Sequence, residues 1–188
     1  MSTEGTRRAF LTAALPLALL SRAAARQSTA ERLVAAIQDG GKIIYLRYPA
    51  AGGVDEARDL GRALYALRVP LNEILAAPLP QARRTAEMAF GTDRLHDARE
   101  LVDAEKSPTA LATLRQFLRT VPGPGMNRVL VGDRAPLELA AERQFPDAVL
   151  PEGAMAVFVS GENTLFLGTM TGERVIASAK ARGALPSR

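Results

Sequence analysis

The sequence predicts an α/β fold, a three-layer sandwich with a mostly parallel central sheet. Short apolar runs of strand length alternate along the chain with longer segments in which apolar residues recur at helical spacing. That alternation is typical of a sheet flanked by helices, in which ligands bind at the carboxyl ends of the strands. The chain has 188 residues, of which 47% are apolar, and this is enough for one domain with a sizeable core.

Helices are expected where capping signals precede an apolar face. Ser28-Thr29-Ala30-Glu31 has the spacing of a capping box, and Gly40-Gly41 ends the helix that follows. Ser107 and Pro108 are an N-cap residue followed by a proline, a pair that favours the start of a helix. After the first helix, the predicted helices cover residues 55–68, 80–90, 107–120 and 136–143.

Strands are expected at the apolar runs between these helices. Residues 42–46 and 128–132 are largely apolar throughout, as in strands buried on both faces of a parallel sheet. Residues 74–77 are a shorter run that leads into Pro78. The predicted closing strands cover residues 154–160, 165–169 and 175–177, with a hairpin-like turn at Gly161-Glu162-Asn163.

The composition limits the chemistry that the chain can perform. It has no cysteine and a single histidine, His96. Disulfides, a thiol nucleophile, iron–sulfur clusters and zinc–thiolate sites are therefore excluded, as is a metal site built from several histidines. No strand is followed by a dinucleotide-binding or P-loop motif, and no G-x-S-x-G motif is present. We expect no metal ion and no cofactor.

The first 25 residues have the pattern of an export signal. Arg7-Arg8 precedes an apolar run from Leu11 to Leu20, and Ala23 and Ala25 fit a signal-peptidase site. We therefore predict a twin-arginine signal peptide over residues 1–25, a folded domain over 26–188, and a periplasmic or secreted location. The apolar run is about half of the roughly 20 residues that span a bilayer, so no membrane anchor is expected after cleavage.

The charge of the mature chain indicates the kind of partner. Cleavage after Ala25 removes three arginines and one glutamate, so 21 of 24 basic residues and 19 of 20 acidic residues remain, and the net charge falls from +4 to +2. That excess is too small for a nucleic-acid footprint. We expect a small molecule or another protein as the partner, and no nucleic acid.

Three short segments follow the predicted strands. They are Leu46-Arg47-Tyr48, the stretch A-A-P-L-P-Q-A-R-R-T-A-E over residues 76–87, and Val131-Gly132-Asp133. In their order and intervals they resemble the Leu-Arg-His, S-S-P-L-x-R-A-x-Q-T-A-E and Val-Gly-His segments of the histidine phosphatase (phosphoglycerate mutase-like) superfamily. The resemblance covers roughly residues 40–169 and implies the phosphoglycerate mutase-like sandwich.

The resemblance also implies where a site would lie. In that superfamily the first histidine attacks phosphorus, two arginines and a second histidine surround the phosphoryl oxygens, and an acidic residue protonates the leaving group. Arg47 matches the first arginine, whereas Tyr48 stands at the nucleophile, Gln81 at the second arginine and Asp133 at the second histidine. No catalytic set is intact. The expected cleft residues are these four together with Arg84, which follows Gln81 by one helical turn.

The substituted residues argue against phosphohistidine chemistry. Lowering the pKa of a tyrosine from about 10 to about 7 needs roughly 4 kcal/mol of differential stabilisation. A carboxylate about 4 Å from a phosphate charge costs about 4 kcal/mol per pair of unit charges at an effective dielectric constant of about 20. We therefore expect Asp133 to pair with Arg47, with Tyr48 beside them, in the place where phosphate would bind.

Three functions remain open at this stage. The first is a pseudo-phosphatase that binds a ligand or a partner without phosphohistidine catalysis. The second is an active phosphoesterase that uses other residues of the same cleft, with Arg47 and Arg84 binding phosphate. The third is a structural exported protein whose cleft is vestigial.

Overall fold

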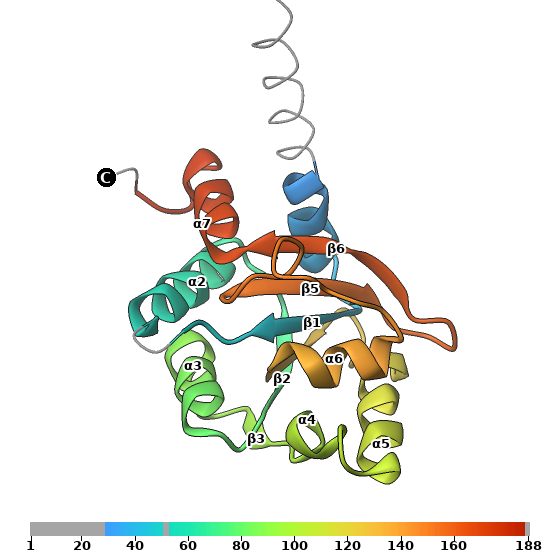
Figure 1. Ribbon diagram of the computed structural model, residues 1–188. Helices are drawn as coiled ribbons and strands as arrows, with labels where there is room; N and C mark the ends of the chain where they lie inside the picture. Colours follow the sequence, from blue (N-terminus) through green and yellow to red (C-terminus); the bar gives the residue numbers. More distant parts are fainter. Residues whose placement is uncertain (1–28, 51–52, 187–188) are drawn as a thin grey trace, which may run out of the picture.

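Six strands form one mixed sheet in the order β3-β2-β4-β1-β5-β6. The computed structural model describes residues 29–50 and 53–186 (Figure 1). The strands are β1 (Lys42–Arg47), β2 (Leu71–Ala76), β3 (Leu95–Asp97), β4 (Asn127–Gly132), β5 (Ala154–Val159) and β6 (Leu165–Thr171). β1 to β4 are parallel, and β5 is antiparallel to both β1 and β6. The signal segment predicted over residues 1–25 lies outside the described residues.

Helices cover both faces of this sheet. They are a helix over residues 29–38, α2 (Val54–Ala66), α3 (Pro80–Phe90), α4 (Glu100–Asp103), α5 (Pro108–Arg119), α6 (Arg134–Ala141) and α7 (Gly172–Ala181). α2 contacts α3 and α7, whereas α5 contacts α4 and α6. Successive residues of β1 face the two groups: Leu46 lines a cavity with residues of α2 and α7, and Tyr45 lies near Leu101 of α4. The predicted three-layer α/β sandwich is confirmed.

Three elements differ from the prediction. Residues 175–177 were predicted as a closing strand, and this is wrong, because they lie in α7 with Val175 and Ala179 buried at helical spacing. An apolar triplet looks the same in a strand and on the buried face of a helix. β3 and α4 were not predicted, since they have three and four residues and too short a pattern to detect. Within the described part of the chain, no helix has the length and apolar character needed to cross a membrane.

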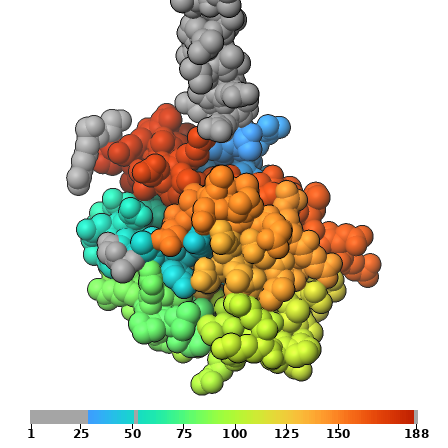
Figure 2. All heavy atoms as spheres, in the orientation of Figure 1, coloured from blue at the N-terminus to red at the C-terminus, as the bar shows by residue number. Residues whose placement is uncertain are grey.

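The strand ends that carry the candidate site meet at one edge of the sheet. Arg47 is in register with Gly132, and Ala76 with Val131, so β1, β2 and β4 end together. β5 runs in the opposite direction, and therefore the residues that precede Ala154 reach the same edge. In Figure 2 the segment that follows β1, in cyan, reaches the surface beside the green of α3 and the orange of residues near 150.

Candidate functional site

Arg47, the last residue of β1, is the centre of the candidate site. Its side chain is only 12% exposed. The Nη1 group donates hydrogen bonds to Oδ1 of Asp147 at 2.6 Å and to the carbonyl oxygen of Leu150 at 2.9 Å. The main chain is held as well, because Gly153 N–H donates to the Arg47 carbonyl at 3.0 Å. The residues between α6 and β5 thus fold over the guanidinium.

Two further carboxylates face the same guanidinium. Asp133 Oδ1 lies 3.8 Å from Nε of Arg47, which confirms the ion pair predicted between these two residues. Glu152 Oε1 lies 3.6 Å from Nη2. Together with Asp147, three carboxylates surround one arginine, and each nitrogen of its guanidinium has an acidic neighbour. Such an arrangement satisfies the charge internally and leaves no free cation for an anionic ligand.

Arg47, Asp133, Asp147 and Glu152 form a charged cluster, the Arg47 cluster. Arg134 extends this cluster on the side of α6. Its Nη1 donates to Asp147 Oδ1 at 2.7 Å, and its Nε lies 3.7 Å from Glu138 Oε1. The hydrogen bond from Arg47, and then the charge of Arg134, lower the pKa of Asp147 from its ordinary value. The cluster thus holds two guanidinium groups and four carboxylates. A phosphate pocket needs the opposite balance of charge.

Asp133 has a second task, which is to begin α6. Its Oδ1 accepts a hydrogen bond from the main-chain N–H of Arg134 at 2.6 Å, and its main-chain carbonyl accepts one from the buried hydroxyl of Tyr45 at 2.6 Å. The helix therefore begins at Arg134, two residues before the predicted start. An aspartate at an N-cap is held in one orientation by the helix. Asp133 is thus part of the framework as well as of the cluster.

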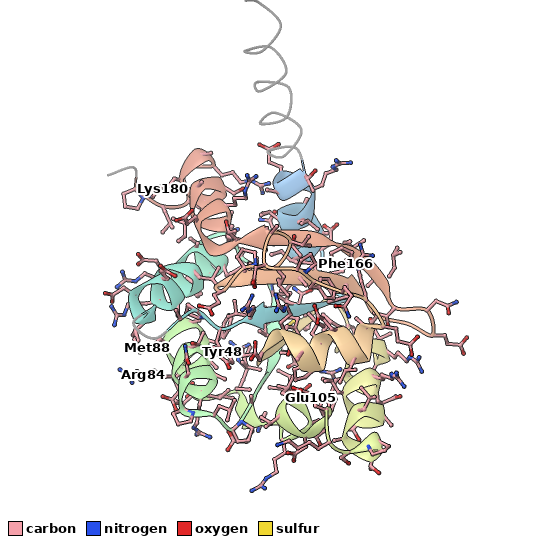
Figure 3. All side chains as sticks on the ribbon, in the orientation of Figure 1. Tyr48, Arg84, Met88, Glu105, Phe166 and Lys180 are labelled. Atoms are coloured by element: carbon pink, nitrogen blue, oxygen red, sulfur yellow. The ribbon has the colours of Figure 1, made fainter. Side chains whose placement is uncertain are left out.

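Tyr48, at the nucleophile position, is partly buried against the core and is labelled in Figure 3. Its main-chain N–H donates to Gly132 O at 3.4 Å. Burial, together with the charges of Asp133 and Glu152, raises the pKa of the Tyr48 phenol, and the opposing charge of Arg47 does not cancel these effects. No hydrogen bond joins its hydroxyl to a residue in the described part of the chain. The phenol is therefore protonated at neutral pH.

Gln81 and Arg84 differ in their relation to the site. Gln81 Nε2 donates to the carbonyl of Pro49 at 2.5 Å and so connects the start of α3 with the loop that follows β1. Arg84 is exposed and has no hydrogen bond or ion pair to the described residues. The structure thus brings Arg47, Tyr48, Gln81 and Asp133 to one edge of the sheet but does not bring Arg84 into the cluster.

Asp147 and Glu152 are the neighbours of Arg47 that sequence analysis missed. They lie between α6 and β5, in a segment without a recognisable motif. Only the sheet topology indicates their position. β5 pairs antiparallel with β1, and so the residues that precede β5 lie next to Arg47 at the end of β1. His96, in contrast, lies exposed in β3 at the sheet edge. Among the described residues, no group of three or more acidic or histidine side chains could hold a metal ion.

The comparison with known proteins gives structural neighbours only. No protein-family model and no curated protein sequence matches this chain. The structure assigned as phosphohistidine phosphatase SixA from Agrobacterium tumefaciens is similar with a TM-score of 0.50 and 15% identity, over 70% of this chain and 97% of that one. The protein histidine phosphatase SixA complexed with tungstate gives a TM-score of 0.51 and 14% identity, over 71% of this chain and 99% of that one. The described chain therefore has an α/β fold similar to that of these two histidine phosphatase structures.

Proposed function

We propose that this protein is an exported pseudo-phosphatase, which uses the histidine-phosphatase fold to bind a small molecule or a protein and does not perform phosphohistidine catalysis. One observation supports this most: Arg47 is bound by Asp133, Asp147 and Glu152. In an active site of the histidine phosphatase superfamily the matching arginine binds the phosphoryl group. Here carboxylates of the protein itself contact the arginine where the phosphoryl group would bind.

The charge of the cluster supports the proposal independently of the missing histidines. A phosphomonoester brings two negative charges, and each carboxylate within about 4 Å would oppose binding by about 4 kcal/mol per pair of charges at an effective dielectric constant of about 20. Glu152 and Asp133 are about half exposed, so solvent reduces this repulsion without reversing its sign. Removal of a carboxylate, or its protonation, would be needed before phosphate could bind.

The nucleophile position supports the same conclusion. A phenol attacks phosphorus effectively only as the phenolate, and the surroundings of Tyr48 raise its pKa and so disfavour that form. No general base lies within hydrogen-bond distance of the Tyr48 hydroxyl among the described residues. Among the described residues, the site thus offers no activated nucleophile at Tyr48 and no unpaired guanidinium at Arg47.

A cavity beside the cluster is compatible with a binding role. It has a volume of about 270 Å³ and lies between α2, α7 and the end of β1. Leu46, Leu60 and Ile176 provide apolar surface, and the acidic lining residues are Glu56, Glu152 and Glu173. No lysine or arginine is among the described residues that line it, which disfavours a phosphomonoester and favours an uncharged or cationic group.

Hydrolysis of a panel of phosphomonoesters by the purified mature chain tests the proposal. We expect no turnover above the buffer background at any pH between about 5 and 9. Two variants serve as controls, Arg47→Ala at the cluster and Arg119→Ala at an exposed arginine of α5. Turnover that persists in Arg119→Ala and disappears in Arg47→Ala would establish an active phosphoesterase and contradict the proposal.

Export is the second part of the proposal and has its own test. The double variant Arg7→Lys/Arg8→Lys keeps the positive charge but removes the arginine pair, so we expect the precursor to remain in the cytoplasm. Arg22→Lys is the matched control and should be exported like the unaltered chain. Cell fractionation with detection of the shorter mature form makes the comparison. Equal export of all three chains would refute the twin-arginine route.

A further inference from the structure

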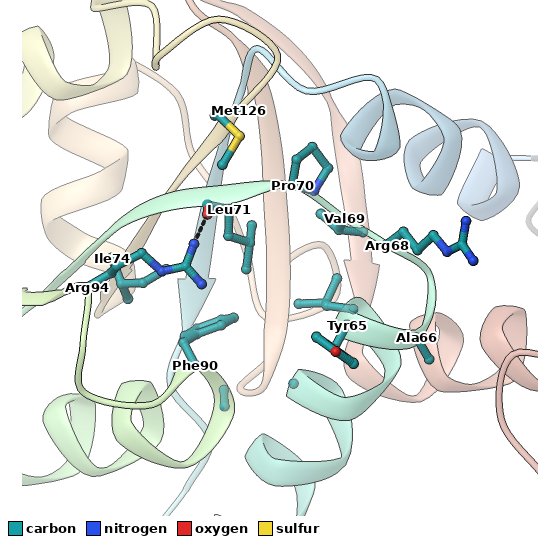
Figure 4. Close-up of a pocket in the computed structure, with 13 residues that line it drawn as sticks. Tyr65, Ala66, Arg68, Val69, Pro70, Leu71, Ile74, Phe90, Arg94 and Met126 are labelled. Carbon is teal, nitrogen blue, oxygen red and sulfur yellow. Dashed lines mark hydrogen bonds between the residues drawn. The ribbon is translucent and has the colours of Figure 1, made fainter.

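A second, larger groove lies at the opposite end of the strands from Arg47. It has a volume of about 680 Å³ and is formed by the end of α2, the start of β2 and the segment after α3 (Figure 4). Its apolar surface includes Leu64, Leu71, Phe90 and Met126. This groove shares no lining residue with the Arg47 cluster. The groove is therefore a surface separate from that cluster.

The charged residues that line the groove are all basic. Arg68 and Arg94 are among the lining residues, and no aspartate or glutamate of the described chain lines the groove. Figure 4 shows the two arginines at opposite ends, with the apolar side chains between them and the side chain of Arg68 extending outward. Tyr65 projects between them and is 87% exposed. Exposed tyrosine and arginine around an apolar surface are typical of positions that dominate protein–protein binding energy.

Arg68 is held in a conformation that does not suit its residue type. Its φ angle is +56°, in the left-handed region where glycine commonly ends a helix. The hydrogen bonds of that ending are present, since Val69 N–H donates to Leu64 O at 3.0 Å and Arg68 N–H to Tyr65 O at 2.9 Å. A glycine would form the same ending without the steric cost. The turn itself therefore does not need an arginine side chain.

The contrast with Glu142 strengthens this point. Glu142 is the other non-glycine residue with positive φ among the described residues, at +50°. Its carboxylate pairs with Arg115 at 2.9 Å, and so its side chain contributes to the fold. Arg68 is exposed, and its side chain makes no hydrogen bond or ion pair with the described residues. Its guanidinium is available to a molecule outside this chain.

We propose that this groove binds an acidic peptide segment of a partner protein. An apolar side chain of the peptide lies over Leu71 and Phe90 beside Tyr65, and carboxylates on either side of it pair with Arg68 and Arg94. The open groove and the two separated guanidinium groups suit an extended chain better than a single compact anion. A nucleic acid is disfavoured because two arginines beside an apolar surface do not make a phosphate-tracking stripe.

Synthetic heptapeptides provide the probe. They carry Leu-Phe or Ala-Ala at the centre and glutamate, glutamine or lysine near both ends. We expect the glutamate peptides with Leu-Phe to bind about tenfold more tightly than their glutamine counterparts, measured by fluorescence anisotropy of the mature chain. In ¹H–¹⁵N spectra the shifts should lie at residues 64–71 and 89–94, and the amides at the Arg47 edge should not move.

Arg68→Gly is the deciding variant because it should not impair folding. We expect its thermal midpoint to equal or exceed that of the unaltered chain, while its affinity for the glutamate peptides falls by about threefold or more. Tyr65→Ala, at an exposed position, should also weaken binding. Glu142→Gly makes the same backbone change at the end of α6, outside the residues that line the groove, and should leave the affinity unchanged.

Three results would overturn the proposal. The first is the absence of saturable binding by any glutamate peptide with Leu-Phe. The second is an affinity that is the same in Arg68→Gly, Tyr65→Ala and the unaltered chain. The third is binding to vesicles of phosphatidylglycerol that depends on Arg68 while the peptides do not bind, which would assign the groove to a membrane surface instead.

Discussion

Replacing Arg47 by alanine is expected to lower the free energy of unfolding by about 2–3 kcal/mol, because the side chain is largely buried and is bonded to several acceptors. The guanidinium that holds Asp147, Leu150 and Glu152 against the end of β1 would be lost. The three carboxylates around it would then lose the cation that they share, and only Asp147 would keep another, Arg134. An arginine that serves only to bind substrate would show the opposite behaviour, a loss of activity with little loss of stability.

Urea and thermal unfolding measure this effect. A loss of this size corresponds to a fall of about 5–10 °C in Tm for a domain of this length. Arg119→Ala is the control, since this exposed arginine has no ion pair in the described chain, and its effect should stay within about 0.5 kcal/mol. Introducing Arg47→Ala into an Asp147→Asn/Glu152→Gln background should cost less than in the unaltered chain, because the repulsion is already removed. Equal stability of Arg47→Ala and Arg119→Ala would contradict a structural role for the cluster.

The second large effect is a gain of anion binding when the cluster is opened. In the double variant Asp147→Asn/Glu152→Gln the guanidinium of Arg47 loses two of its three charged neighbours. We expect its affinity for tungstate, a tetrahedral oxyanion, to rise by about tenfold or more over the unaltered chain. Isothermal titration or a tungstate-induced shift of Tm measures the change.

A matched control separates local opening from the change in total charge. Glu105→Gln/Glu162→Gln also removes two negative charges, from exposed residues without ion pairs in the described chain. Its affinity for tungstate should remain close to that of the unaltered chain, since exposed charges far from a site are largely screened at physiological salt. If both double variants gained equally, the effect would be one of net charge and not of the Arg47 cluster.

The parts of the fold with strong local signals could be predicted from the sequence. The buried runs of β1 and β4, and the capping residues at the start of α5, have patterns that few other structures produce. The prediction of a strand at residues 175–177 was wrong because an apolar triplet does not distinguish a strand from the buried face of a helix such as α7. β3 was not predicted because its three residues are mostly exposed at the sheet edge and show no alternation of buried and exposed positions.

The contacts of the site also divide into those with a local sequence signal, which could be predicted, and those without one. The pairing of Arg47 with Asp133 could be predicted because one ends and the other directly follows a parallel strand, and the carboxyl ends of these strands meet at one edge. Asp147 and Glu152 could not, because their position depends on the path of an irregular segment between α6 and β5. A one-dimensional pattern does not record how such a segment folds over a side chain. These two residues nevertheless decide the charge of the site.

Titration of the unaltered mature chain with tungstate tests the central claim most directly. The readout is the Nε–H resonance of Arg47 in ¹H–¹⁵N spectra, assigned by its absence in an Arg47→Lys chain. We predict that this resonance does not move in up to about 10 mM tungstate, because the carboxylates already occupy the guanidinium. A saturable shift at micromolar tungstate would mean that Arg47 is open to phosphate-like anions, and the pseudo-phosphatase account would be wrong.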